Sequence, residues 1–202
     1  MSPRRSSDDS DPHTLRVGLL GGWRGLDPWE AQDFSGVIVR NQCFESPYTR
    51  DGSQVIHDPR YLEHALRFDT IASTGFPRYS ARIVEDIVFS DGSPVQPGDI
   101  AASLAHVAPL RAMTSVNAAG GRRVQFNARS KDARIESQLA QIWSVIGKRG
   151  PKGWWLGTGP YAIVHENIAE EGHVLTLERN PHWKAGSLTR RPSSGSNSTP
   201  TR

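Results

Sequence analysis

Two glycine-rich segments have the composition of phosphate-binding loops, which hold a phosphate with backbone amides at the start of a helix. Gly21-Gly22-x-x-Gly25 follows a short apolar stretch, and Gly157-Thr158-Gly159-Pro160 lies further along the chain. Leu26-Asp27-Pro28 follows the first segment at once, and no Gly-Lys-Ser/Thr follows the second. Both segments therefore indicate sharp backbone turns rather than nucleotide sites.

Nucleophilic and metal chemistry have little support in the sequence. Cys43 and His57 lack the spacing of a cysteine-protease signature, and no serine lies in a nucleophile elbow. A lone cysteine is usually a small buried hydrophobe. The histidines are scattered and form no His-Glu-x-x-His pattern. We expect no enzyme, no metal site and no cofactor, with a hydrolase using serine or Cys43 as the least favoured alternative.

The tryptophans suggest a binding surface. Trp154 and Trp155 lie in a glycine-rich loop just before Gly157, and Trp23 follows Gly22 in the first glycine turn. Aromatic side chains on loops at strand ends make rigid contact surfaces for ligands, although they can equally fill the core of a small lobe. Gly22, Trp23, Trp154 and Trp155 are our candidate ligand-binding residues.

Short elements must position these residues, beginning with an alternating strand over 15–20. A helix is expected after Asp27-Pro28, with these apolar residues to bury: Phe34, Val37, Ile38 and Phe44. Residues 79–89 indicate one or two strands closed by a turn at 90–94.

The second half of the chain predicts two more helices and a hairpin. The first helix has Pro97 as its first residue and Asp99 in its first turn, and its apolar stripe is Ile100, Leu104 and Val107. The second is expected from Ser130 to Gly147, with the stripe Ile135, Leu139, Ile142, Trp143 and Ile146. Strands over 161–165 and 174–179 are joined by a polar turn at 167–172.

Composition narrows the function classes. The 202 residues suit one domain or one large lobe, and 36% are hydrophobic. No stretch approaches the ~20 apolar residues that a membrane-spanning helix needs. The single cysteine excludes an internal disulfide. The net charge is +3, but the last nineteen residues contain four basic residues and no acid, so we expect no nucleic-acid partner.

Both ends have the composition of disordered tails. Residues 1–13 are rich in Ser, Asp, Arg and Pro, and residues 184–202 in Ser, Thr, Pro and Arg. No apolar segment of a secretion signal follows the first tail, so the chain as written is expected in the cytoplasm. Residues 14–183 are expected to form the folded lobe.

Three segments together resemble the family 5 extracytoplasmic solute-binding proteins, the oligopeptide-, dipeptide- and nickel-binding receptors of ABC importers. Phe89-Ser-Asp-Gly-Ser-Pro is similar to the family's F-S-D-G-x-P element, which continues through Asp99 to Leu104. Gly157-Thr-Gly-Pro-Tyr161 is similar to its G-T-G-P-Y, and Glu178-Arg-Asn-Pro-His-Trp183 to its E-R-N-P-x-[YW]. Leu26-Asp27-Pro28 and Tyr79-Ser-Ala-Arg-Ile fit the same order.

The resemblance implies an α/β fold: lobe I of the type II (cluster C) periplasmic-binding proteins, a mixed sheet with flanking helices, and the second lobe absent. It implies non-covalent capture of a peptide or peptide-like solute in an interlobe cleft, delivery to an ABC permease, and no direct membrane insertion. The matching positions are expected to define the fold: Phe89, Asp91, Gly92, Asp99, Gly157, Gly159, Pro160, Tyr161, Asn180 and Pro181.

Family members are several hundred residues long, so the resemblance predicts a truncated receptor. The Ser/Thr/Pro/Arg tail is then a frameshift product or a premature end. With one lobe, a bound ligand stays half exposed and affinity is expected to be weak. The alternative is a signal-less cytoplasmic ligand-sensing or protein-interaction module derived from the same lobe.

Overall fold

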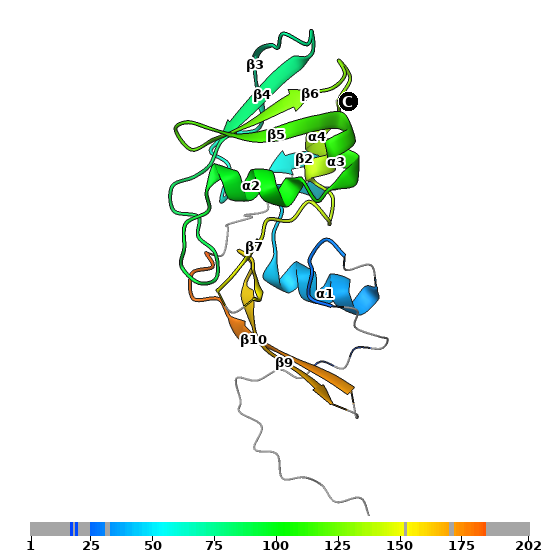
Figure 1. Ribbon diagram of the computed structural model, residues 1–202, viewed down its shortest axis with the longest axis vertical. Helices are drawn as coiled ribbons and strands as arrows, with labels where there is room; N and C mark the ends of the chain where they lie inside the picture. The colour runs from blue at the N-terminus through cyan, green and yellow to red at the C-terminus, as the bar shows by residue number, and fades with distance from the viewer. Residues whose placement is uncertain are drawn as a thin grey trace, which may run out of the picture.

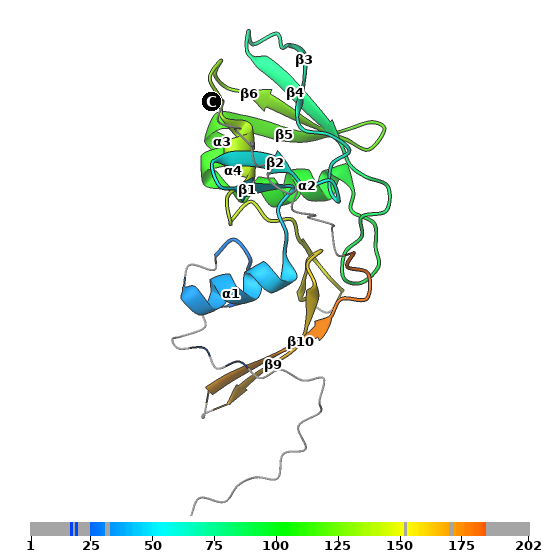
Figure 2. The same cartoon turned by 180° about the vertical axis from the view of Figure 1, so that it is seen from behind.

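The computed structural model describes residues 17, 19, 25–30, 33–151, 153–169 and 172–184. Figures 1 and 2 show these residues as two parts that lie one above the other along the long axis. One part contains a four-stranded sheet with three helices, and the other contains α1, a short hairpin and a long one. The predicted tails, apart from Lys184, and most of the strand expected over 15–20 lie outside the described residues.

The larger part is built on the sheet β3-β4-β6-β5. Its strands are β3 Arg67–Ile71, β4 Pro77–Arg82, β6 Arg123–Ala128 and β5 Thr114–Ala119. A separate hairpin, β1 Tyr48–Asp51 with β2 Gln54–His57, lies beside it. Cross-strand partners such as Tyr79 with Phe126 and Ala81 with Val124 face the larger core. Alternate residues therefore leave the opposite face of the sheet polar.

Three helices complete this part: α2 Pro97–Leu104, α3 Ala108–Met113 and α4 Ile135–Leu139. The prediction for α2 is confirmed. Pro97 opens it, and the Asp99 carboxylate accepts a hydrogen bond from the backbone N–H of Gln96 at 2.8 Å. The predicted stripe of Ile100, Leu104 and Val107 is buried, with Val107 just beyond the last turn.

The long helix predicted over 130–147 is wrong, because only α4 forms there. Ile142 is 51% exposed and Trp143 is 38% exposed, whereas Val145 and Ile146 are buried in different cores. Adjacent residues on one face of a helix would pack in the same core, so this burial does not fit a helix. The Ile146 N–H donates to the Glu45 carbonyl at 3.0 Å, so contacts with distant segments replace the helical hydrogen bonds.

The smaller part consists of α1 Phe34–Cys43, β7 Lys148–Arg149 with β8 Trp155–Leu156, and the hairpin of β9 Tyr161–Ala169 with β10 Gly172–Arg179. The predicted hairpin is confirmed and its strands are longer than expected. The predicted helix is also confirmed, but its buried face was misread. Phe34 is 75% exposed, while Val39 and Cys43 pack in the smaller core with Phe44, Val145 and Ile163.

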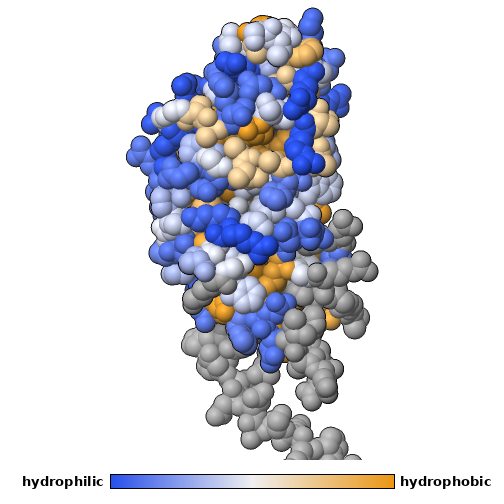
Figure 3. Space-filling model, viewed as in Figure 1, coloured by the Kyte–Doolittle hydropathy of each residue, from blue (hydrophilic) through white to orange (hydrophobic). Residues whose placement is uncertain are grey.

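All strand pairs among the described residues are antiparallel, so the parallel component of the expected mixed sheet is not found there. The space-filling view in Figure 3 shows a largely hydrophilic face with separate apolar patches, one of them at the level of α1. Within the described part of the chain, no helix has the length and hydropathy to span a membrane.

The glycine turn at 157–159 lies directly against the end of α1. The Gly159 N–H donates to the Cys43 carbonyl at 3.0 Å. A Cβ on Gly157 would lie 2.0 Å from that carbonyl oxygen, and one on Gly159 would lie 2.6 Å from the Cys43 carbonyl carbon. Because both neighbours are backbone atoms, only glycine fits at these positions.

The segments that begin at Phe89 and at Glu178, which also carry the family resemblance, form hydrogen bonds with this turn. The Ser90 N–H donates to the Gly157 carbonyl at 2.9 Å. The buried Asn180 side chain donates to the Gly159 carbonyl at 2.8 Å, and the Asn180 N–H donates to the Pro160 carbonyl at 2.8 Å. Segments near residues 90, 158 and 180 therefore form one backbone junction.

We predict that Gly157→Ala lowers the free energy of unfolding by roughly 3 kcal/mol or more, because the added methyl group overlaps backbone that cannot move independently. Gly98→Ala on α2 is the matched control, since its Cβ meets nothing within 4 Å. Replacing a helical glycine there should be neutral or stabilise by about 0.5 kcal/mol. Urea denaturation of the two variants measures the difference, and equal midpoints would contradict the close approach.

Candidate functional site

The candidate ligand-binding residues fall in three places. Gly22 and Trp23 lie outside the described residues. Trp154 is partly buried and packs against the smaller core. Trp155, on β8, packs there too, but its ring also belongs to an aromatic cluster that reaches the larger part. Of the four candidates, Trp155 is therefore the one whose contacts in the structure indicate a possible site.

The aromatic cluster consists of Trp29, His106 and Trp155. The His106 ring stacks on Trp29 with centroids 4.2 Å apart and 12° between the planes. Trp155 meets Trp29 edge-on at 4.9 Å, and the Arg149 guanidinium lies 4.1 Å from the Trp155 ring centroid. Trp29 precedes α1 and His106 follows α2, so the cluster joins segments from both parts.

Sequence reasoning missed Trp29 and His106. The signal for Trp29 was its place directly after Leu26-Asp27-Pro28, where Asp27 accepts the Trp29 N–H at 3.0 Å and fixes the turn. His106 carried no such signal. It lies two residues beyond the end of α2, and only the fold brings it to Trp29.

A groove of about 470 Å³ opens beside this cluster. It lies between α1 and the segments that begin α3 and follow α4. Its lining residues are Trp29, Val37, Arg40, His106, Val107, Ala108, Pro109, Ile142 and Trp143. The volume and the largely apolar lining are typical of small-molecule sites. Ile142 and Trp143, whose side chains are exposed, both lie on the groove wall.

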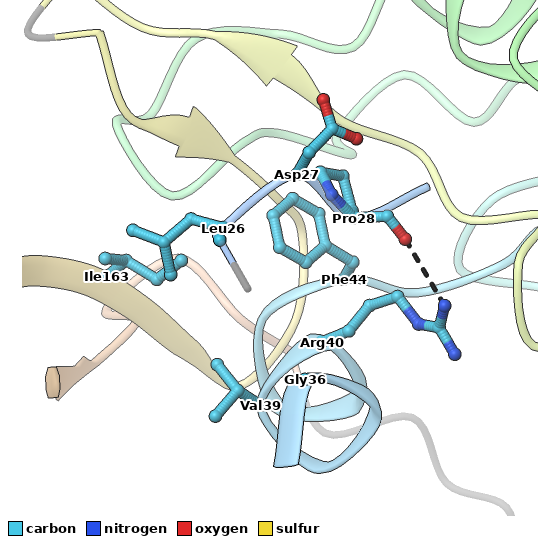
Figure 4. Close-up of a pocket in the computed structure, with 9 residues that line it drawn as sticks. Leu26, Asp27, Pro28, Gly36, Val39, Arg40, Phe44 and Ile163 are labelled. Atoms are coloured by element: carbon cyan, nitrogen blue, oxygen red, sulfur yellow. Dashed lines mark hydrogen bonds between the residues drawn. The ribbon is translucent and has the colours of Figure 1, made fainter. Parts of the chain in front are cut away.

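A second hollow behind α1 is too small to be a site. Its volume is about 10 Å³, which is about that of one water-sized probe. Figure 4 shows Phe44, Val39 and Ile163 around it, with the Arg40 guanidinium turned toward the Pro28 carbonyl. Arg40 Nη1 donates to that oxygen at 3.3 Å. The bond ties the segment carrying Trp29 to α1, which also places Arg40 on the groove wall.

The Glu45 carboxylate, just after α1, connects three segments that are distant in the sequence. Arg60 Nη1 lies 2.7 Å from Glu45 Oε1 and pairs with Asp58 at 2.6 Å. Trp183 Nε1 donates to Glu45 at 3.0 Å, and the Thr158 hydroxyl donates to its second oxygen at 3.4 Å. Burial raises the pKa of Glu45, while the Trp183 hydrogen bond and the Arg60 charge oppose that shift.

The structure gives no support to Cys43 as a nucleophile. Cys43 is 2% exposed in the smaller core, and burial raises the pKa of its thiol to about 12. Among the described residues no group of three His, Cys, Asp or Glu side chains has the arrangement of a metal site.

Solved structures share this fold. AgaA from A. tumefaciens R10, in complex with agropinic acid, aligns with a TM-score of 0.61 and 15% identity over 82% of this chain and 35% of its own. The Bacillus subtilis oligopeptide-binding protein AppA, in complex with a nonapeptide, gives 0.58 and 16% over 78% and 34%. The Bacillus halodurans nickel ABC transporter gives 0.57 and 20% over 78% and 33%. The chain has the fold of a type II periplasmic solute-binding protein.

The expected fold class is thus confirmed, and the aligned region is part of a longer solute-binding protein in each of these structures. The chain spans about a third of the length of these neighbours. No protein-family model matches the chain, and no curated protein sequence is significantly similar to it. Identities of 15–20% establish the solute-binding fold alone.

We predict that Glu45→Ala lowers the free energy of unfolding by roughly 2–3 kcal/mol, because Arg60 and the Trp183 indole lose a buried acceptor. Arg82→Ala is the control, since its pair with Glu63 at 3.1 Å is largely exposed and should contribute at most about 1 kcal/mol. Thermal and urea unfolding of both variants provide the measurement. Equal losses would show that Glu45 has no special role.

We predict that Cys43 is nearly inert in the folded chain. A thiol pKa of about 12 leaves about one thiolate in ten thousand at pH 8, and the side chain is also buried. Iodoacetamide labelling followed by mass spectrometry should therefore be at least about a hundredfold slower than in guanidinium chloride, where the pKa returns to about 8.5. Equal rates in the two states would refute this assignment.

Proposed function

We propose that this chain is part of a solute-binding receptor that captures a peptide or peptide-like solute without covalent chemistry, for delivery to an ABC permease. The observation that carries the proposal is the groove of about 470 Å³ between the two parts of the fold. Its wall offers the rings of Trp29, His106 and Trp143, which bind ligands with little loss of side-chain entropy.

The structural neighbours support binding rather than catalysis. Listeria monocytogenes OppA was solved bound to peptide and AppA with a nonapeptide, whereas Staphylococcus aureus NikA was solved with Ni(L-His)2. Ligands on this fold therefore differ widely in chemistry. A peptide-like solute is our choice because the groove couples aromatic rings with a few polar groups, which suits a chain of mixed side chains.

We predict weak binding by the 202-residue chain alone. The groove is open to solvent, so a peptide in it keeps part of its surface hydrated, and association still costs translational and rotational freedom. Isothermal titration calorimetry with tri- to pentapeptides should give dissociation constants in the micromolar range or above. A sub-micromolar complex would contradict the prediction of weak binding.

The same titrations test whether the groove is the site. Trp143→Ala, on the groove wall, should weaken peptide binding about fivefold or more. Phe68→Ala is the control, because Phe68 is a 59% exposed aromatic on β3 and does not line the groove. Equal binding by both variants would place the ligand elsewhere. No binding by the unmodified chain would overturn the proposed function.

A further inference from the structure

The groove presents apolar side chains to solvent. Ile142, Trp143, Ala108 and Pro109 all line it, are exposed and carry no charge. Neither Ile142 nor Trp143 belongs to either core, so the packing of the fold does not require an apolar side chain at these two positions. Exposed apolar surface that gathers at one place commonly marks a binding site.

The same apolar surface continues along α1. Val37 lines the groove, and Phe34 lies three residues earlier, which places both side chains on one face of the helix. Phe34 is strongly exposed, although a phenylalanine side chain gains free energy when it is removed from water. The apolar wall therefore extends beyond the groove along α1.

Charged groups contribute little to the surface of the groove. Among the lining residues that the structure describes, Arg40 is the only one with a permanent charge, and none is Asp, Glu or Lys. Arg40 is 4% exposed, and its Nη1 donates to the Pro28 carbonyl at 3.3 Å. Its guanidinium is therefore largely withdrawn from the surface that a solute meets.

An uncharged apolar wall distinguishes side chains by what they lose on leaving water. An aromatic or aliphatic side chain gains free energy when it moves from water to such a wall. A lysine, glutamate or glutamine side chain gives up hydrogen bonds to water and finds few partners there. Aromatic rings gain further from the rings of Trp143 and His106, because stacked or edge-on rings attract each other beyond the area they bury.

From this lining we infer that the groove selects solutes with an aromatic side chain, such as a peptide that contains phenylalanine, over solutes whose side chains are polar or charged. The inference rests on the proposed function and names the class of solute that its site takes. A neutral ring complements a surface that exposes no permanent charge. The volume of about 470 Å³ lies in the range of small-molecule sites, so a side chain and its neighbouring backbone both fit.

Blocked tripeptides test the preference without terminal charges. The probes are acetyl-Ala-X-Ala-amides in which X is phenylalanine, glutamine, glutamate or lysine. Titrations followed by tryptophan fluorescence and calorimetry should give the phenylalanine peptide about tenfold tighter binding than each of the others. Because no charge takes part, raising sodium chloride from about 50 to about 500 mM should change its dissociation constant less than about twofold.

A matched pair of variants tests whether the groove causes the preference. Ala108 lines the groove and is exposed, so a longer side chain there leaves the cores intact. Ala108→Glu should weaken binding of the phenylalanine peptide about fivefold and make the lysine peptide bind at least as tightly. Ala108→Met, of similar length and uncharged, should keep the original order. Ala102→Glu on α2, which is exposed and does not line the groove, controls for a general charge effect.

An exchange of nearly equal volume provides a second test. Val37→Thr replaces a methyl group on the groove wall by a hydroxyl group and should weaken binding of the phenylalanine peptide about threefold. Val174→Thr on β10 is the control, because Val174 is exposed and does not line the groove, and it should leave binding unchanged. Unfolding temperatures are measured first, and the Ala108 pair decides the matter if Val37→Thr does not fold.

The outcomes separate the two proposals. Equal binding of the phenylalanine and glutamine peptides, tightest binding of a charged peptide, or an unchanged order in Ala108→Glu would overturn the aromatic-solute inference and leave solute binding in place. Binding of unblocked peptides without binding of any blocked probe would also overturn it. Binding of no peptide of either kind would overturn the proposed function together with this inference.

Discussion

The contact between the end of α1 and the turn at Gly157 is the constraint on which the rest of the structure depends. The Cys43 carbonyl lies so close to Gly157 and Gly159 that no side chain fits between the two backbones. Segments more than a hundred residues apart are thereby locked together. Because Ser90 and Asn180 bond to the same turn, the junction also fixes the start of the 90–94 loop and the end of β10.

The junction also explains why a charged cluster is buried beside it. Glu45 follows α1, and its backbone carbonyl accepts the Ile146 N–H while its carboxylate accepts from Arg60 and Trp183. Burying a carboxylate costs free energy unless its oxygens are satisfied, and here several donors satisfy them. The geometry of these donors depends on the junction being closed. Removing Glu45 is therefore costly, because its partners would stay buried without an acceptor.

Sequence patterns correctly predicted the elements whose conformation depends on neighbouring residues in the chain. The residues Pro97 and Asp99 marked α2, and alternation marked the β9–β10 hairpin. The failures occurred where distant contacts decide the conformation. The apolar stripe from Ile135 to Ile146 has helical spacing, yet the helix ends at Leu139, and Val145 and Ile146 pack in different cores. Phe34 satisfied a helical pattern and is exposed. The candidate site was predictable in part: Trp155 was a candidate, but Trp29 and His106 become neighbours through the fold alone.

Most of the groove wall is separate from the residues that hold the fold together, so its specificity can change without loss of the fold. Its walls come from α1, from the segment between α2 and α3 and from the segment after α4, whereas the junction is made by other residues. Ala108, Ile142 and Trp143 are exposed and outside both cores, so their identities are free of packing constraints. Arg40 is different, because it both lines the groove and bonds to the Pro28 carbonyl. A positive charge at this wall is therefore tied to the fold, while the residues around it are open to change.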